Sequence, residues 1–70
     1  MGMGIIVRVW PEKGFGFVRS DEPEAVEYFF HRTSVIGTDI KELRSGDRVE
    51  FTPEVSDKGP RAGEVRRSAA

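Results

Sequence analysis

The sequence of 70 residues contains no cysteine and only one histidine, His31. The absence of cysteine excludes disulfide bonds, and one histidine without thiolates cannot supply the usual ligands of a zinc site. We therefore expect no metal and no cofactor. A chain of this length without disulfide bonds or a metal site relies on its apolar core, and the expected free energy of unfolding is only about 3–5 kcal/mol. The lack of cysteine also fits a reducing cytoplasm, the location that we expect.

Long apolar runs are absent as well. The longest, residues 5–7, is far shorter than the roughly 20 residues that a membrane-spanning helix needs. The N-terminal segment also lacks the charged region and apolar run of a signal peptide. The sequence therefore predicts no membrane partner.

A clear excess of basic charge is missing too. Eleven basic residues stand against 12 acidic residues, which gives a formal net charge of −1. A domain held to nucleic acid by bulk charge is usually plainly basic. Binding of nucleic acid would therefore require a local basic patch and base stacking.

Short apolar segments alternate with turn signals along the whole chain, without repeats or linkers, so we expect a single domain over residues 1–70. The expected strands are Ile5–Trp10, Phe15–Arg19, Val26–His31, Arg48–Val55 and Ala62–Arg67. Loops or turns are expected at residues 11–14, 20–25, 45–47 and 56–60, and a short helical turn near residues 33–36. Five short strands predict an all-β fold, a small closed antiparallel barrel, because closure removes exposed sheet edges.

Side-chain alternation divides the third strand into two faces. Glu27 and His31 share one face with Phe29, and their polarity marks this face as the outer one. Val26, Tyr28 and Phe30 then point into the core.

The second strand carries the motif KGFGF at residues 13–17. Placing Val18 inside also places Gly16 inside, which turns Phe15 and Phe17 outward beside Lys13. The rest of the core is expected to contain Ile6, Val35, Leu43, Val49, Phe51 and Val65.

Phenylalanine in a strand is usually a core residue, so burial of these rings is the ordinary alternative. An exposed apolar patch usually indicates a binding site. Aromatic rings interleaved with cations on a β-surface suit single-stranded nucleic acid, whose bases stack on rings while cations follow the phosphates. The same patch on a barrel could instead bind a hydrophobic or proline-rich peptide.

The chain resembles the bacterial cold-shock domain family in three motifs that occur in the family's order. They are KGFGFV at residues 13–18, YFFHRT at 28–33 and GPRAGEV at 59–65. The resemblance implies an OB-type five-stranded barrel that binds single-stranded RNA and DNA as a nucleic-acid chaperone. It also implies that Phe15, Phe17, Phe29 and His31 form the stacking platform.

The sequence departs from the family pattern at several platform positions. Arg8 stands where the family has tryptophan, and Trp10 is displaced by two residues, which preserves its parity within the strand. Arg32 and Ile40 occupy two further positions that are usually aromatic. Guanidinium groups also stack on bases, so arginine can replace rings there. For Trp10, packing over a barrel end is the alternative.

The candidate nucleic-acid-binding residues are Arg8, Trp10, Lys13, Phe15, Phe17, Phe29, His31, Arg32, Lys58 and Arg61. Arg66 and Arg67 are given no specific role, and the acidic loop with Asp21, Glu22 and Glu24 is expected to lie off the binding face. No carboxylate or hydroxyl cluster supports catalysis by His31, so we do not expect an enzyme. The predicted protein is a monomeric RNA chaperone, or a regulator of transcription or translation, with low sequence specificity.

Overall fold

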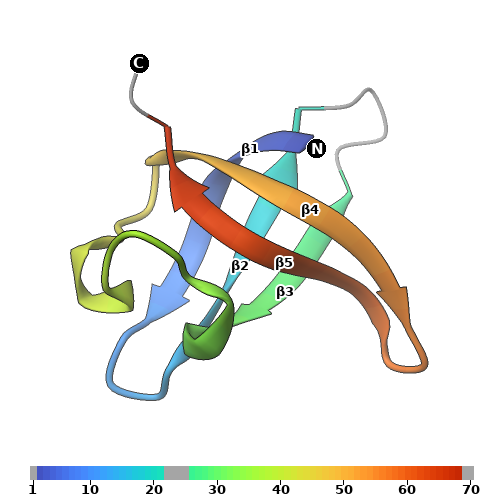
Figure 1. Ribbon diagram of the computed structural model, residues 1–70, viewed down its shortest axis with the longest axis horizontal. Coiled ribbons are helices and arrows are strands. Elements are labelled where there is room, and N and C mark those ends of the chain that lie inside the picture. The colour runs from blue at the N-terminus through green and yellow to red at the C-terminus, as the bar shows by residue number, and fades with distance from the viewer. Residues whose placement is uncertain (1, 22–25, 69–70) are drawn as a thin grey trace.

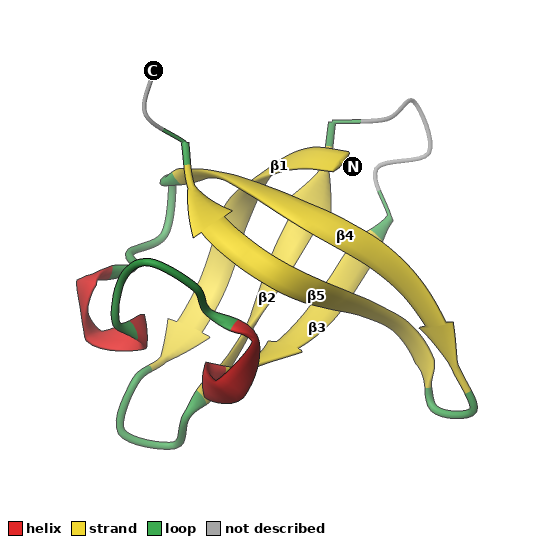
Figure 2. Ribbon diagram, in the orientation of Figure 1, coloured by secondary structure: helices red, strands yellow, loops and turns green. Residues whose placement is uncertain are grey.

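The computed structural model describes residues 2–21 and 26–68 (Figure 1). Its strands are β1 (Gly2–Trp10), β2 (Phe15–Ser20), β3 (Glu27–His31), β4 (Arg48–Ser56) and β5 (Gly59–Arg67). Two 3₁₀ turns, η1 (Arg32–Ser34) and η2 (Ile40–Glu42), lie between β3 and β4 (Figure 2). In the part of the chain that the structure describes, no helix is long and apolar enough to cross a membrane.

The five strands form a closed barrel, as the sequence predicts, and their order around it is β1-β2-β3-β5-β4. Neighbouring strands are antiparallel except β3 and β5, which meet in parallel at the pair Phe29 and Arg61. In Figure 1 the long β4 and β5 cross in front of β1, β2 and β3, and their hairpin extends beyond the barrel. This crossing leaves the outer side of β1, β2 and β3 uncovered by another strand.

The barrel interior holds the expected apolar side chains. Buried residues are Ile6, Val18, Phe30, Ile40, Leu43, Val49, Phe51, Ala62 and Val65, and Val35 and Tyr28 pack against this cluster. The predicted core is confirmed except for Val26, which is half-buried and lies outside this cluster. Ile40 and Ala62 are additions to it, because the turn η2 folds Ile40 into the barrel end instead of onto the surface.

Gly16 and Phe30 face each other across the β2–β3 ladder inside the barrel. A Cβ on Gly16 would lie 2.7 Å from Cζ of Phe30 and 2.7 Å from the carbonyl oxygen of Arg8. The Phe30 ring, which has no exposed surface, therefore uses the space that a side chain at position 16 would need. This contact confirms the predicted inward placement of both residues.

A β-bulge in β1 changes which face its last residues occupy. Ile6 pairs with Val18, but the next pair along the ladder is Arg8 with Phe17, so Val7 is an extra residue on β1. Strict alternation would put Arg8 on the same face as buried Ile6. The bulge at Val7 turns Arg8 outward instead.

The connection between β3 and β4 closes one end of the barrel. Leu43 is buried there, and the backbone N–H of Ile36 donates to the carbonyl oxygen of Val65 at 2.8 Å. The expected helical turn near residues 33–36 begins one residue earlier, at Arg32, and η2 was not predicted. The turn at residues 45–47 is present: the Gly46 N–H donates to the carbonyl oxygen of Ile6 at 2.8 Å.

The strands are longer than the sequence predicts at four ends, the starts of β1 and β5 and the ends of β2 and β4, while β3 starts one residue later than predicted. β1 starts at Gly2 because residues 2–5 pair with β4. The hairpin between β4 and β5 is tighter than the expected loop at 56–60, since Ser56 already pairs with Gly59. β5 therefore starts at Gly59 instead of Ala62. In the predicted loop 20–25, residues 22–25 lie outside the described residues.

The Gly16 contact leads to a stability prediction. Gly16→Ala forces the new methyl group against the Arg8 carbonyl and the Phe30 ring, and we expect it to lower the free energy of unfolding by about 1–3 kcal/mol. Gly2→Ala is the control, because a Cβ there meets only the Phe51 ring, at 3.3 Å. Urea denaturation measures both variants. Equal stability of the two would contradict this packing.

Candidate nucleic-acid interface

Two rows of outward side chains cross the uncovered side of the barrel. Residues that face each other across the ladders are Trp10, Phe15 and His31 in the first row, and Arg8, Phe17, Phe29 and Arg61 in the second. Inward residues such as Gly16 and Phe30 alternate with them and are buried. The structure therefore brings together seven of the ten residues predicted for the site in two adjacent rows.

The four aromatic rings of these rows, Trp10, Phe15, Phe17 and Phe29, form one continuous patch, which we call the ring surface. Trp10 lies 5.0 Å from Phe15 and 6.2 Å from Phe17, between ring centroids. Phe29 lies 5.8 Å from both Phe15 and Phe17. Each ring thus contacts two others, and such pairs contribute about 0.5–1.5 kcal/mol each.

All four rings are half-buried. Their edges pack on one another, while part of each ring stays open to solvent. They are consequently neither core residues nor freely rotating surface side chains. Contacts between the rings hold them in place before any ligand arrives, which reduces the entropy that binding must overcome.

The position of Trp10 results from the bulge at Val7. Trp10 pairs with Phe15 at the end of β1 and contacts the rings on both sides of Gly16. The ring therefore faces the same surface as the phenylalanines, and the alternative of packing over a barrel end does not describe it. Arg8 takes the position opposite Phe17, where it is exposed.

The β4–β5 hairpin supplies cations at one edge of the ring surface. A hollow there is lined by Phe17, Phe29, Ser56, Lys58, Gly59, Pro60 and Arg61. Lys58 and Arg61 are both exposed. The hollow places two positive charges beside two stackable rings, as the sequence predicts for these residues.

Arg32 lies at the opposite edge, over the turn that precedes Phe15. Its backbone N–H donates to the carbonyl oxygen of Gly14 at 2.8 Å. A Cβ on Gly14 would lie 3.1 Å from Cδ of Arg32, and Gly14 has a φ of 79° that other residues rarely adopt. Glycine at this position therefore lets the stem of Arg32 lie against the backbone. Lys13, next to it in the turn, is exposed.

His31 is oriented by Thr33. The backbone N–H of Thr33 donates to Nδ1 of His31 at 3.3 Å, and the Thr33 hydroxyl lies 3.1 Å from the same nitrogen. Since Nδ1 accepts these bonds, the neutral ring carries its proton on Nε2. Nε2 is then the nitrogen left to donate to a ligand beside Phe15.

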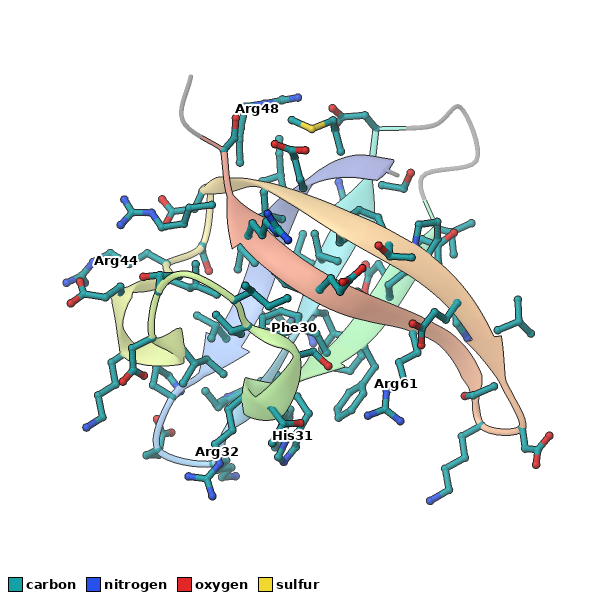
Figure 3. All side chains as sticks on the ribbon, in the orientation of Figure 1. Phe30, His31, Arg32, Arg44, Arg48 and Arg61 are labelled. Atoms are coloured by element: carbon teal, nitrogen blue, oxygen red, sulfur yellow. The ribbon has the colours of Figure 1, made fainter. Side chains whose placement is uncertain are left out.

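The cations of the site are not neutralised by ion pairs in the described part of the chain. Within the described residues, none of the five site cations has a carboxylate partner within 4.0 Å; the ion pairs found there join Arg19 to Glu27 and Arg48 to Asp21. Figure 3 shows His31, Arg32 and Arg61 along one side, with Arg48 at the opposite end. Asp21 lies with Arg48, away from the ring surface, as expected. Glu22 and Glu24 lie outside the described residues.

The sequence and the fold both match known proteins. The family model of the 'Cold-shock' DNA-binding domain matches residues 3–68. The major cold shock protein of Micrococcus luteus is 35% identical over 65 residues, which cover 93% of this chain and 96% of that protein. The probable cold shock protein A of Mycobacterium tuberculosis is 42% identical over 55 residues, or 79% of this chain and 81% of that protein.

A solved structure, Drosophila Unr CSD456, superposes on 96% of this chain with a TM-score of 0.76 and 31% identity. This chain spans 26% of the length of that longer chain. The barrel with its ring surface is thus the OB-type fold of a nucleic-acid-binding domain. The chain belongs to the cold-shock domain family, and its activity is nucleic-acid binding of the cold-shock type.

The adjacent residues Phe29 and Phe30 test the assignment of faces. Phe30→Ala removes a fully buried ring and should lower the free energy of unfolding by about 3–5 kcal/mol, which leaves little or no folded protein. Phe29→Ala removes a half-buried ring and should cost less, about 1–3 kcal/mol, the value of its two ring contacts. Circular dichroism during urea denaturation compares them. Greater damage by Phe29→Ala would contradict the assignment.

Proposed function

We propose that this protein binds single-stranded RNA and DNA with little sequence preference and acts as an RNA chaperone that keeps strands unpaired. The observation that carries the proposal is the ring surface, four mutually supported rings on the uncovered side of the barrel. Bases of a single strand can stack on such rings for about 1–3 kcal/mol each. Paired bases do not expose their faces, so duplexes gain little from this surface.

Cations on two edges of the ring surface support a defined path for the phosphates. Lys58 and Arg61 lie at the hairpin edge, and Arg32 lies at the opposite edge. Arg8 lies opposite Phe17 in the second row, and Lys13 lies in the turn that precedes Phe15. Since these residues have no ion-pair partner among the described residues, their charge remains available to the backbone of a bound strand. A chain with a net charge of −1 can thereby present a locally positive surface.

The peptide-binding alternative is less favoured. Membership in the cold-shock domain family and the cations around the rings both support nucleic acid. We further propose that the protein acts as a monomer in the cytoplasm, on unpaired transcripts, and that it regulates transcription or translation through binding and not through enzymatic activity.

Titration of Trp10 fluorescence tests the proposal directly. Trp10 is the one tryptophan in the sequence and belongs to the ring surface, so its emission reports on this site. Oligothymidine should quench the emission, and duplex DNA should quench it far less. The logarithm of the binding constant should fall with the logarithm of salt at a slope of about −0.7 for each phosphate contacted.

Two variants with one matched control locate the binding. Phe15→Ala should weaken binding by about 1–3 kcal/mol through lost stacking, and Arg61→Ala should make the salt slope shallower by about 0.7 through one lost phosphate contact. The control is Arg67→Ala, an exposed arginine on the same strand as Arg61 but outside the two rows. Equal effects of Arg61→Ala and Arg67→Ala, or binding that ignores salt, would contradict the proposed path.

A further inference from the structure

A second hollow extends the ring surface beyond Arg32. It measures about 410 Å³ and is lined by Pro11, Arg32, Thr33, Thr38, Asp39, Ile40 and Lys41. Pro11 follows Trp10, and Arg32 follows His31, so the hollow continues the first row of the binding site. Its volume lies within the range of about 300–1,000 Å³ that is usual for ligand sites. The hollow is therefore large enough for one base.

Arg32 lines this hollow and lies at the edge of the ring surface. Its stem rests on Gly14, and its guanidinium has no carboxylate partner within 4.0 Å among the described residues. Asp39, although it lines the same hollow, is therefore not neutralised by Arg32. Arg32 and Lys41, which donate hydrogen bonds, thus line the same hollow as Asp39, which accepts them.

Asp39 is held in place by the first turn of η2. Its Oδ1 accepts a hydrogen bond from the backbone N–H of Lys41 at 3.1 Å. No hydrogen bond within the described residues is found for Oδ2, so this oxygen can accept from a ligand. Ile40, only 4% exposed, adds an apolar residue to the lining. The carboxylate is consequently oriented by the fold and is still exposed.

The lining carries one carboxylate, Asp39, and two cations, Arg32 and Lys41. The open oxygen of Asp39 accepts from N–H groups, which the base of a nucleotide offers and its phosphate does not. Guanine carries two adjacent N–H donors on its Watson–Crick edge, which match the two oxygens of a carboxylate, and its O6 and N7 accept from an arginine. Thymine and uracil present one donor between two carbonyl oxygens, which a carboxylate disfavours. Adenine and cytosine present a single amino group beside an acceptor nitrogen.

We propose that this hollow is an end site that selects guanine, through hydrogen bonds to Asp39 and contact with Arg32. The proposal rests on the proposed binding of single strands along the ring surface. It gives an otherwise sequence-tolerant protein a preference for one base at one end of its binding site. It assigns this preference to Asp39, which lies outside the three sequence motifs.

The test uses hexathymidine and its derivatives with one guanine, adenine or cytosine at the 5′ or the 3′ end, titrated against Trp10 fluorescence. Guanine at one of the two ends should bind roughly 5- to 150-fold more tightly than thymine at that end. Adenine should gain much less, since it stacks as well as guanine but lacks the paired donors. An equal gain for adenine and guanine, or no gain for guanine at either end, would overturn the end site.

Asp39→Asn and a control variant complete the experiment. Asparagine still caps η2 through its oxygen, so the fold should persist, but it offers only one acceptor. The ratio of the dissociation constants for terminal thymine and terminal guanine should fall toward 1. Glu42→Gln, on the same turn but outside the lining of the hollow, should keep the ratio. An unchanged ratio in Asp39→Asn would overturn the role of Asp39.

Tight binding of hexathymidine without guanine preference would overturn the end site and leave the proposed function intact. Failure to bind any oligonucleotide would overturn both the end site and the proposed function.

Discussion

The close approach of the Phe30 ring to the backbone of Gly16 decides which face of β2 and β3 is the interior of the barrel. The ring has no exposed surface, and a Cβ at position 16 would come within 2.7 Å of it. Because side chains alternate along a strand, this single inward pair requires Phe15, Phe17 and Phe29 to point outward. The packing of Phe30 against Gly16 in the core therefore also determines which side chains form the binding surface.

Outward rings create a solubility problem that their mutual packing partly solves. Each ring of the ring surface contacts two others, so much of its area is removed from water without a ligand. The cations around them keep the surface hydrated and favour anionic partners over another copy of the same apolar patch. The low stability expected of so short a chain limits how many rings can be left outside. This limit is consistent with arginine, and not a further ring, at positions 8 and 32.

Most of the fold and of the binding surface could be predicted from the sequence, since both depend on alternation in β2 and β3, where Glu27 and His31 mark the outer face. The placement of Trp10 could not be derived in this way. Ile6 inside and Trp10 outside have the same parity, and only the bulge at Val7 reconciles them. The turn η2 was missed because three residues give no periodic pattern. The hollow at Asp39 was missed with it, since its lining comes from segments that are distant in the sequence.

The most direct test of the account maps the bound strand onto the barrel by NMR of the isotope-labelled protein. Backbone amide signals are followed as oligothymidine is added. We expect the largest shifts in the two outward rows, at Phe15, Phe17 and Phe29, and along residues 59–61 of β5, while Arg44 and Arg67 change little. Shifts centred on Arg44 and Arg67, with the ring surface unchanged, would contradict the central claim that the outward rings receive the strand.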